Sequence, residues 1–314
     1  MLVPILFMMA GVALLYYGAE TLVRGAATLA VRGNMSPLLV GLTVVAFGTS
    51  APELVVSVQA TLAGNGGIAV GNVVGSNICN IALILETATL VRPLQVDAQL
   101  VRLDIPLLIG VSVVLAIFLA NETLSTVEGA ALLAGVIAYV LFSIRVARHR
   151  VDGALVELEV EVKPEGSAGR DIVFVVIGLG LLVLGSHALV SGAVTIATSL
   201  GVSEAIIGLT IVALGTSLPE LATSIMAAFK GEGELALGNV VGSSLFNALG
   251  ILGVAALLRP LDSSGIGLAD LGMMLAMAVL VLPLARTGYE LSRPEGAFLL
   301  ALYVGYVGFL TGVV

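Results

Sequence analysis

The 314-residue chain contains few charged residues, one cysteine and no tryptophan. Asp, Glu, Lys and Arg make up 11% of it, whereas about 25% is usual in soluble domains. The chain therefore has too few charged residues to cover a surface that faces water. Because 13 basic residues stand against 21 acidic ones, the basic surface of a nucleic-acid-binding protein is excluded. The lone Cys79 excludes a disulfide framework and a cysteine-based metal centre.

Apolar residues make up 59% of the chain and form long runs. Since a membrane-spanning helix needs about 20 mostly apolar residues, we expect an all-α membrane protein. The first run has no basic start and no cleavage site, so it is predicted to be a permanent span. The runs predict ten transmembrane helices, at about 3–30, 36–62, 67–91, 103–120, 127–146, 171–198, 203–229, 234–258, 268–285 and 296–313.

Lys and Arg residues predict the orientation of these helices. If the N-terminus is outside, 12 of the 13 lie on the cytoplasmic side and Arg259 alone lies outside. Both termini are therefore expected outside, and the long loop 147–170 inside. Val or Leu alternates with Glu over residues 156–162 of this loop, which fits a solvated hinge, a short strand or a regulatory cation site.

The two halves of the chain are repeats of each other. A shift of 167 residues aligns 18–94 with 185–261 without gaps, and 38 of the 77 positions are identical. We expect a first repeat at 1–146, a cytoplasmic linker at 147–170 and a second repeat at 171–314. Because each half holds an odd number of helices, five, the halves are predicted to have inverted topology, which is typical of secondary transporters.

Glu53 and Glu220 occupy equivalent positions near the middle of two predicted spans. A carboxylate at the bilayer centre costs at least ~2.5 kcal/mol, and no Lys or Arg lies at that depth in either half. A proton on each acid, or a bound cation, must therefore compensate the charge.

The residues around the two acids offer oxygen atoms. Thr49 and Thr216 lie four residues before the acids, on the same helix face. Pro52 and Pro219 are expected to free backbone carbonyls near 46–48 and 213–215. Stripes with a spacing of four follow in the next helices, where they suit ion binding or plain helix contacts: Asn72, Ser76, Asn80, Asn239, Ser243 and Asn247. Carboxylate, hydroxyl, amide and carbonyl oxygens are typical ligands of Ca²⁺ and Na⁺.

At these residues the chain resembles the sodium/calcium exchangers of the cation/calcium antiporter superfamily, in the prokaryotic form without a regulatory domain. Segments 41–80 and 208–247 match the alpha repeats of that family, G-x-T-x-x-(A/S)-x-G-T-S-x-P-E followed by G-N-x-x-G-S-x-x-x-N. The resemblance implies an ion-binding core made of the second, third, seventh and eighth helices, with the first and sixth helices sliding across it. It also implies a location in a prokaryotic inner membrane.

The resemblance further implies a ligand set for Ca²⁺ and Na⁺. The two glutamates bind both ions, Asn247 in place of an acid argues against K⁺ dependence, and the remaining ligands come from side chains and from two backbone carbonyls. The full set is Glu53, Glu220, Thr49, Thr216, Ser50, Ser217, Asn80, Asn247, Ser76, Ser243, and the carbonyls of Ala46 and Ala213.

The expected function is therefore antiport of Ca²⁺ against several Na⁺ by alternating access, with no enzymatic activity and no cofactor. The bilayer is the expected environment, a monomer is expected to suffice, and the oligomeric state stays open. Alternatives are cation/H⁺ exchange on the same acids, a channel, and an intramembrane hydrolase with His187. Glu86 is expected to reach towards the cytoplasmic surface, while Glu20 and His187 either gate the pathway, sense pH or pack at the interface.

Overall fold

The computed structural model describes residues 2–33, 35–154, 167–200 and 213–310. The first half contains α1 (Leu2–Arg32), α2 (Pro37–Val40), η1 (Gly41–Val45), α3 (Ala46–Thr49), α4 (Ala51–Leu62), α5 (Gly66–Cys79), η2 (Asn80–Leu85), α6 (Glu86–Val91), β1 (Leu94–Gln95), η3 (Leu100–Asp104), α7 (Ile105–Leu119), β2 (Thr123–Leu124) and α8 (Thr126–Ala154). The second half contains α9 (Ala168–Ser199), α11 (Ala213–Thr216), α12 (Leu218–Lys230), α13 (Gly233–Leu245), η5 (Phe246–Ile251), α14 (Leu252–Leu258), β3 (Leu261–Asp262), α15 (Leu268–Arg286), β4 (Glu290–Leu291) and α16 (Arg293–Leu310).

The chain is an all-helical integral membrane protein, as predicted. Seven helices among the described residues are long and apolar enough to cross a bilayer, and the bent pair 37–49 and 51–62 adds an eighth. The first part of the predicted span 203–229 and most of the predicted loop 147–170, including its alternating segment 156–162, lie outside the described residues. The membrane-spanning part of α8 ends at Val146, as predicted, and the helix continues beyond it to Ala154, so the first residues of the predicted loop are helical.

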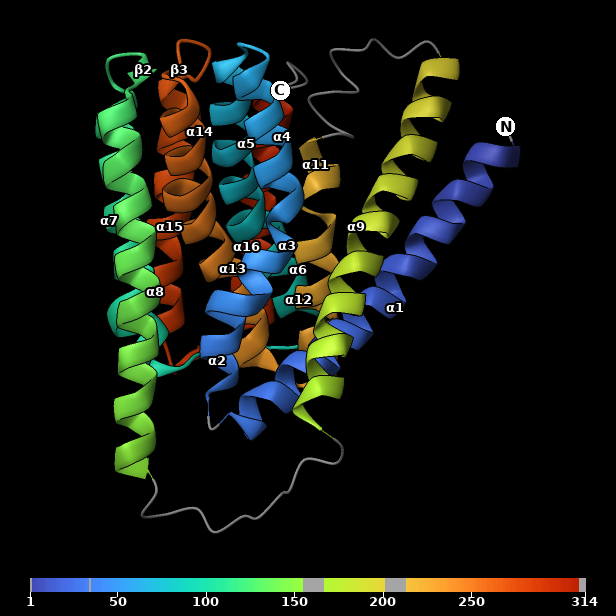
Figure 1. Ribbon diagram of the computed structural model, residues 1–314, viewed down its shortest axis with the longest axis vertical. Helices are drawn as coiled ribbons and strands as arrows, with labels where there is room; N and C mark the ends of the chain where they lie inside the picture. Colours follow the sequence, from blue (N-terminus) through green and yellow to red (C-terminus); the bar gives the residue numbers. More distant parts are fainter. Residues whose placement is uncertain (1, 34, 155–166, 201–212, 311–314) are drawn as a thin grey trace.

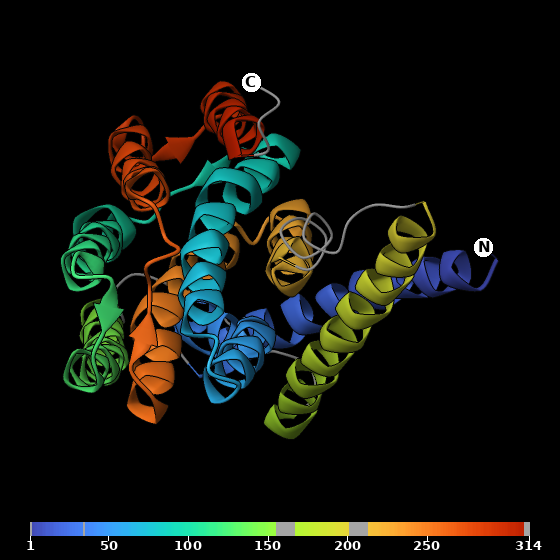
Figure 2. The same cartoon turned by 90° about the horizontal axis from the view of Figure 1, so that it is seen from above.

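Two groups of helices make up the molecule. Figure 1 shows α1 and α9 lying together at one side, and Figure 2 shows the other helices gathered into a bundle beside them. Within the bundle, α4, α5, α12 and α13 lie at the centre, and α7, α8, α15 and α16 lie on the outer side. This arrangement places the two repeated motifs in the middle of the bundle.

Glycines bring α1 and α9 together along their length. A Cβ added to Gly18 would lie 2.9 Å from the backbone nitrogen of Leu182, and one added to Gly178 would lie 2.6 Å from that of Leu22. Small residues let helix backbones approach closely in lipid, so α1 and α9 pack as one antiparallel pair. Arg32 and Asp171 add an ion pair of 2.9 Å between the end of α1 and the start of α9.

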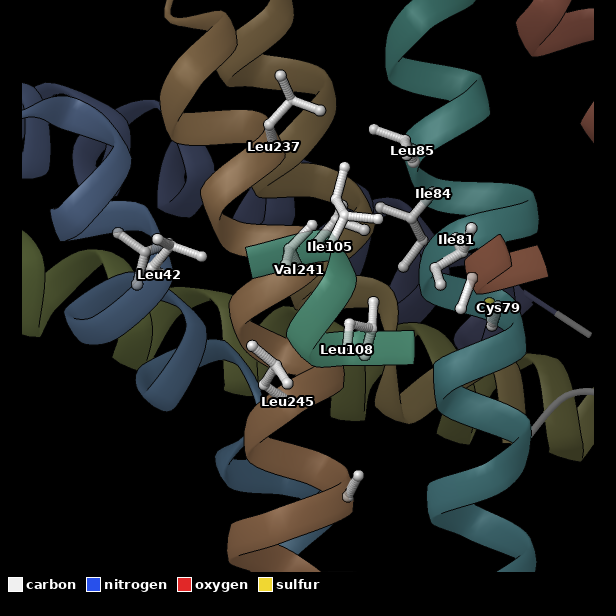
Figure 3. Close-up of a cluster of buried hydrophobic side chains, with 14 of the residues drawn as sticks. Leu42, Cys79, Ile81, Ile84, Leu85, Ile105, Leu108, Leu237, Val241 and Leu245 are labelled. Atoms are coloured by element: carbon white, nitrogen blue, oxygen red, sulfur yellow. The ribbon is translucent and has the colours of Figure 1, made fainter. Parts of the chain in front are cut away.

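Close glycine contacts also join the two halves inside the bundle. A Cβ on Gly238 of α13 would lie 2.7 Å from the carbonyl oxygen of Leu38 and 3.0 Å from the Cα of Gly41. Apolar side chains fill the neighbouring space, with Leu42, Leu237, Val241 and Leu245 on one side and Ile81 and Ile84 on the other (Figure 3). The motif-bearing helices are therefore held in fixed positions.

Short strands join the two halves at the ends of the bundle. Leu94 pairs with Leu291 between β1 and β4, and Leu124 pairs with Leu261 between β2 and β3. The continuous helix of 26 residues from Gly66 to Val91 starts beside β3, where a Cβ on Gly66 would lie 2.6 Å from the Asp262 nitrogen, and it ends just before β1. At 1.5 Å per residue such a helix is about 39 Å long, so the two strand pairs lie at opposite ends.

Candidate cation-binding site

Both glutamates lie in the first turn of a helix that follows a break. Ser50 has φ −80° and ψ 7°, and Ser217 has φ −86° and ψ 7°, a region of φ/ψ space that is sparsely populated and common in active sites. The two segments of the first broken span meet at 45°. Pro52 lies in the first turn of α4, where its missing N–H costs nothing. Glu53 therefore lies at a helix N-terminus, which favours negative charge.

Pro52 and Pro219 were expected to disrupt the helix backbone, and the structure places the breaks at Ser50 and Ser217. Thr49 ends α3 and Glu53 lies in the first turn of α4, so the two do not share one face of a continuous helix. The carbonyl of Ala46 is not left without donors either, since the backbone N–H of Ser50 donates to it at 3.1 Å. The hydroxyl of Ser243 also donates to this carbonyl oxygen at 3.4 Å, and the hydroxyl of Thr49 lies 3.3 Å from it.

Each glutamate is bound by a serine from the other half of the chain. Ser50 donates to Oε1 of Glu220 at 2.9 Å, and Ser217 donates to Oε1 of Glu53 at 3.0 Å. Ser217 also lies 3.3 Å from the hydroxyl of Ser76. Both carboxylates are buried, with exposures of 0% for Glu53 and 1% for Glu220. The two repeats therefore contribute equivalent residues to one buried site.

The amides of Asn72 and Asn239 hold the backbone around this site, which is the helix-contact role left open for their stripes. Asn72 donates to the carbonyl of Glu53 at 3.2 Å and to Ser57 at 3.0 Å. Asn239 does the same in the other half, with Glu220 at 3.3 Å and Ser224 at 2.9 Å. The equal spacing of Asn72 and Asn239 from the acids was the available signal. The hydrogen bonds of Asn72 and Asn239 thus hold the broken helices in place. Ser76 and Asn80, which belong to the same stripe as Asn72, contact Ser217 and Ser244 instead.

The hydroxyl of Thr49 contacts residues of the other half of the chain. Its hydroxyl donates to Oδ1 of Asn239 at 3.0 Å and lies 3.5 Å from the hydroxyl of Ser243. Asn80 donates to the hydroxyl of Ser244 at 3.4 Å. Thr216 is also buried, with 8% exposure, and Ala213 is described as the first residue of α11. The structure thus brings together Thr49, Ser50, Glu53, Ser76, Asn239, Ser243, Ser217 and Glu220 by direct contacts.

Several buried oxygens remain without hydrogen-bond partners in the described part of the chain. Four of them belong to predicted ligands: Oε2 of Glu53, Oε2 of Glu220, Oδ1 of Asn80 and Oδ1 of Asn247. Buried polar atoms without partners are rare because their desolvation is costly. Two carboxylates surrounded by neutral oxygens fit a hard cation such as Ca²⁺ or Na⁺. The described residues contain no cluster of three or more His, Cys, Asp or Glu, so neutral oxygens would have to complete the coordination.

Two acids outside this set differ in their surroundings. Glu86 was predicted to reach the surface, and this was wrong: its exposure is 0%, because α6 continues a buried helix and packs against α16. Glu20 on α1 instead lies at the surface and pairs with Lys230 at 3.4 Å. His187, its counterpart in the second repeat, lies on α9 and forms no ion pair among the described residues.

Comparisons with known proteins cover almost the whole chain. The family model described as sodium/calcium exchanger protein matches residues 3–145 and 171–312. The candidate antiporter CaxA of Alkalimonas amylolytica is 41% identical over 312 residues, with 98% of each chain covered. The sodium/calcium exchanger MaX1 of Methanosarcina acetivorans is 32% identical over 341 residues, with 97% of each covered. A solved structure of the sodium-calcium exchanger NCX_Mj, soaked with Na⁺ and Sr²⁺, is 32% identical, has a TM-score of 0.86 and covers 98% of each chain.

Proposed function

The chain belongs to the sodium/calcium exchanger family, and from this membership and the buried site we propose that it exchanges Ca²⁺ for several Na⁺ across the membrane. It is a transporter of the cation/calcium antiporter type, and its family is one of exchangers rather than enzymes. We propose that it acts without a cofactor, and that the transported ions are its ligands. The bilayer is its environment, and one chain suffices for transport.

The observation that carries this proposal is the pair of buried glutamates with one unpartnered oxygen each. Two negative charges balance one Ca²⁺ ion, or are shared among several Na⁺ ions that use the same oxygens. The two ions would therefore compete for one site. The proposed ligands are the predicted set: Glu53, Glu220, Thr49, Thr216, Ser50, Ser217, Asn80, Asn247, Ser76, Ser243 and the carbonyls of Ala46 and Ala213.

We further propose that the α1–α9 pair moves as one body against the bundle to open the site to each side in turn. Two observations support this movement. Glycines bring α1 and α9 closest to each other, and small residues lie where α9 meets the motif helices. A Cβ on Gly48 would lie 2.5 Å from the Leu179 side chain, and Ser186 donates to the carbonyl of Gly215. An empty site with two charges would oppose the movement, and a bound ion would permit it.

For the architecture we propose ten spans in two inverted halves, 1–146 and 171–314, joined by a cytoplasmic linker at 147–170. Support comes from the strands: Leu94 and Leu261 are equivalent in the repeat and lie at opposite ends of the bundle. Both termini would face outwards, and bacterial and archaeal relatives support a prokaryotic inner membrane.

The test is radioactive Ca²⁺ uptake into proteoliposomes loaded with Na⁺ and diluted into Na⁺-free buffer. Wild-type protein should take up Ca²⁺ only when Na⁺ is inside, and Glu53→Gln and Glu220→Gln should lose uptake while eluting as folded protein in size-exclusion chromatography. Glu122→Gln, an exposed acid in the β2 turn, is the matched control and should transport normally.

Cation/H⁺ exchange on the same acids is the second candidate, because a proton would also satisfy an unpartnered carboxylate oxygen. Uptake driven by a proton gradient in Na⁺-free buffer, and indifferent to internal Na⁺, would favour it and would overturn Na⁺ coupling. Flux that follows the Ca²⁺ gradient without any counter-ion would instead indicate a channel.

A further inference from the structure

Glu86 is a buried acid that the proposed ion site does not use. It is the first residue of α6, which continues the helix of Ser76 and Asn80. Its exposure is 0%, and neither carboxylate oxygen has a hydrogen-bond partner in the described part of the chain. Its counterpart in the second repeat is Gly253, so the repeat symmetry of the ion site does not account for it.

The carboxyl group of Glu86 lies in the contact between α6 and α16. A Cβ added to Gly296 of α16 would lie 3.1 Å from Oε2 of Glu86, 3.1 Å from the methyl group of Thr89 and 3.3 Å from the Glu86 carbonyl oxygen. Glycine at this position lets the α16 backbone close over the carboxyl group. The α16 backbone at Gly296 therefore lies directly beside Oε2.

The charged and titratable groups on the helices packed against α6 have other contacts. On α16, Arg293 donates to the carbonyls of Leu90 and Val91, and Glu295 accepts from Ser292. The side chains of the other groups form no hydrogen bond or ion pair with α6 among the described residues, and each lies beside another residue instead. Glu220 contacts Ser50, Lys230 contacts Glu20, Tyr306 contacts Asp270, Tyr303 lies beside Cys79, and Arg92 lies beside Gly231. The described residues therefore supply no positive charge to a Glu86 carboxylate.

An ionised carboxylate buried without a partner is strongly disfavoured, and a proton removes the charge without needing space. We propose that Glu86 is a proton-binding site, protonated when α6 and α16 are packed as here, and that loss of the proton at alkaline pH loosens this contact. Asn80 lies six residues earlier on the same helix, or about 9 Å along its axis. Loosening at Glu86 therefore displaces a proposed ion ligand and slows exchange.

Thermal unfolding in detergent tests the proton site without any transport. A folded state that holds one more proton than the unfolded state loses stability as pH rises, with its folding equilibrium falling up to tenfold per pH unit. The melting temperature of wild-type protein should therefore fall from neutral to alkaline pH more steeply than that of Glu86→Gln, whose neutral amide cannot titrate. Glu122→Gln should follow the wild type, since that acid is exposed.

Transport provides the second readout and rests on the proposed exchange function. With equal pH on both sides, wild-type exchange should decline at alkaline pH, and Glu86→Gln should keep most of its neutral-pH rate. A purely structural role would change stability without changing this pH profile. If the wild type exchanges no Ca²⁺ at any pH, the proposed function fails. The unfolding comparison still tests whether Glu86 binds a proton.

Parallel pH profiles of wild type and Glu86→Gln in the unfolding experiment would overturn the proposal. If Glu86→Gln does not fold, Glu86→Met removes the titrating group with similar volume, and its melting temperature should also fall less steeply with pH than that of the wild type. Melting temperatures in Na⁺ and in choline buffers test whether a cation occupies this site instead of a proton. Stabilisation by Na⁺ that is lost in Glu86→Gln would assign a cation to the site and would overturn the proposed proton site.

Discussion

At the scale of single residues, the serine–glutamate contacts across the two halves are the most informative. Ser217 donates to Glu53 at 3.0 Å and would also be a cation ligand. A hydrogen bond to a charged group is worth about 1.5–3 kcal/mol, and each 1.4 kcal/mol corresponds to tenfold in affinity. We therefore expect Ser217→Ala to raise the Ca²⁺ concentration for half-maximal uptake by about tenfold to a hundredfold, measured in proteoliposomes.

Ser112→Ala is the matched control for this substitution. Ser112 is also buried, at 2% exposure, but it donates to the carbonyl of Leu108 within its own helix, α7. It should leave the Ca²⁺ dependence unchanged. An equal change in both variants, or none in Ser217→Ala, would contradict the role of Ser217 at the ion.

The residue scale also shows what sequence could and could not predict. The repeated motif made it predictable that Glu53 and Glu220 lie close together, because two equivalent buried acids can have their charges compensated by one bound cation. The prolines indicated a disrupted backbone, but the position of the break at Ser50 was not predicted, because a spacing of four between Thr49 and Glu53 also fits one helix face. Glu86 was misjudged because an acid near a helix end normally reaches water, and only the packing of Gly296 shows that it is enclosed here.

At the scale of elements, the contact between α1 and α9 depends on small residues. A Cβ on Gly178 would lie 2.6 Å from the Leu22 backbone nitrogen, too close for any side-chain adjustment to relieve. Overpacking of this kind typically costs about 1–3 kcal/mol. Gly178→Ala should therefore lower the melting temperature and reduce exchange, because the backbones of the moving pair are forced apart.

Gly180→Ala tests whether this effect comes from the contact or from the change in helix propensity. Gly180 lies on the exposed side of the same helix, and nothing in the described structure would lie within 4 Å of its added Cβ. Since alanine favours helix over glycine by about 1 kcal/mol, this variant should be as stable as wild type or slightly more stable. Equal loss of stability in both variants would argue against close packing as the cause.

At the scale of the whole molecule, an ion pair between described residues connects the α1–α9 pair to the bundle. Lys230 at the end of α12 lies 3.4 Å from Glu20 on α1, and both side chains are partly exposed. Exposed pairs contribute about 0.2–1 kcal/mol and are screened by salt. Lys230→Gln should therefore change the initial exchange rate by at most about fivefold, with the difference fading at high ionic strength, and the double charge reversal of Glu20 and Lys230 should restore the rate. A change in the initial exchange rate that does not depend on salt would contradict an electrostatic role of this ion pair.

The proposed inversion of the two halves makes a prediction about the sides of the membrane. Gln95 and Asp262 directly follow Leu94 and Leu261, the last equivalent pair of the repeat; both are exposed, and they lie in strands β1 and β3. The backbone N–H of Ser264 donates to Asp262 at 2.9 Å and lowers the pKa of that carboxyl, as befits a charged group in water. With Cys79 replaced by serine, Asp262→Cys should react with a membrane-impermeant maleimide on intact spheroplasts, and Gln95→Cys only after permeabilisation. Labelling of both from one side would overturn the inverted repeat, whereas an exchange of the two sides would keep the inversion and reverse the proposed orientation of the termini.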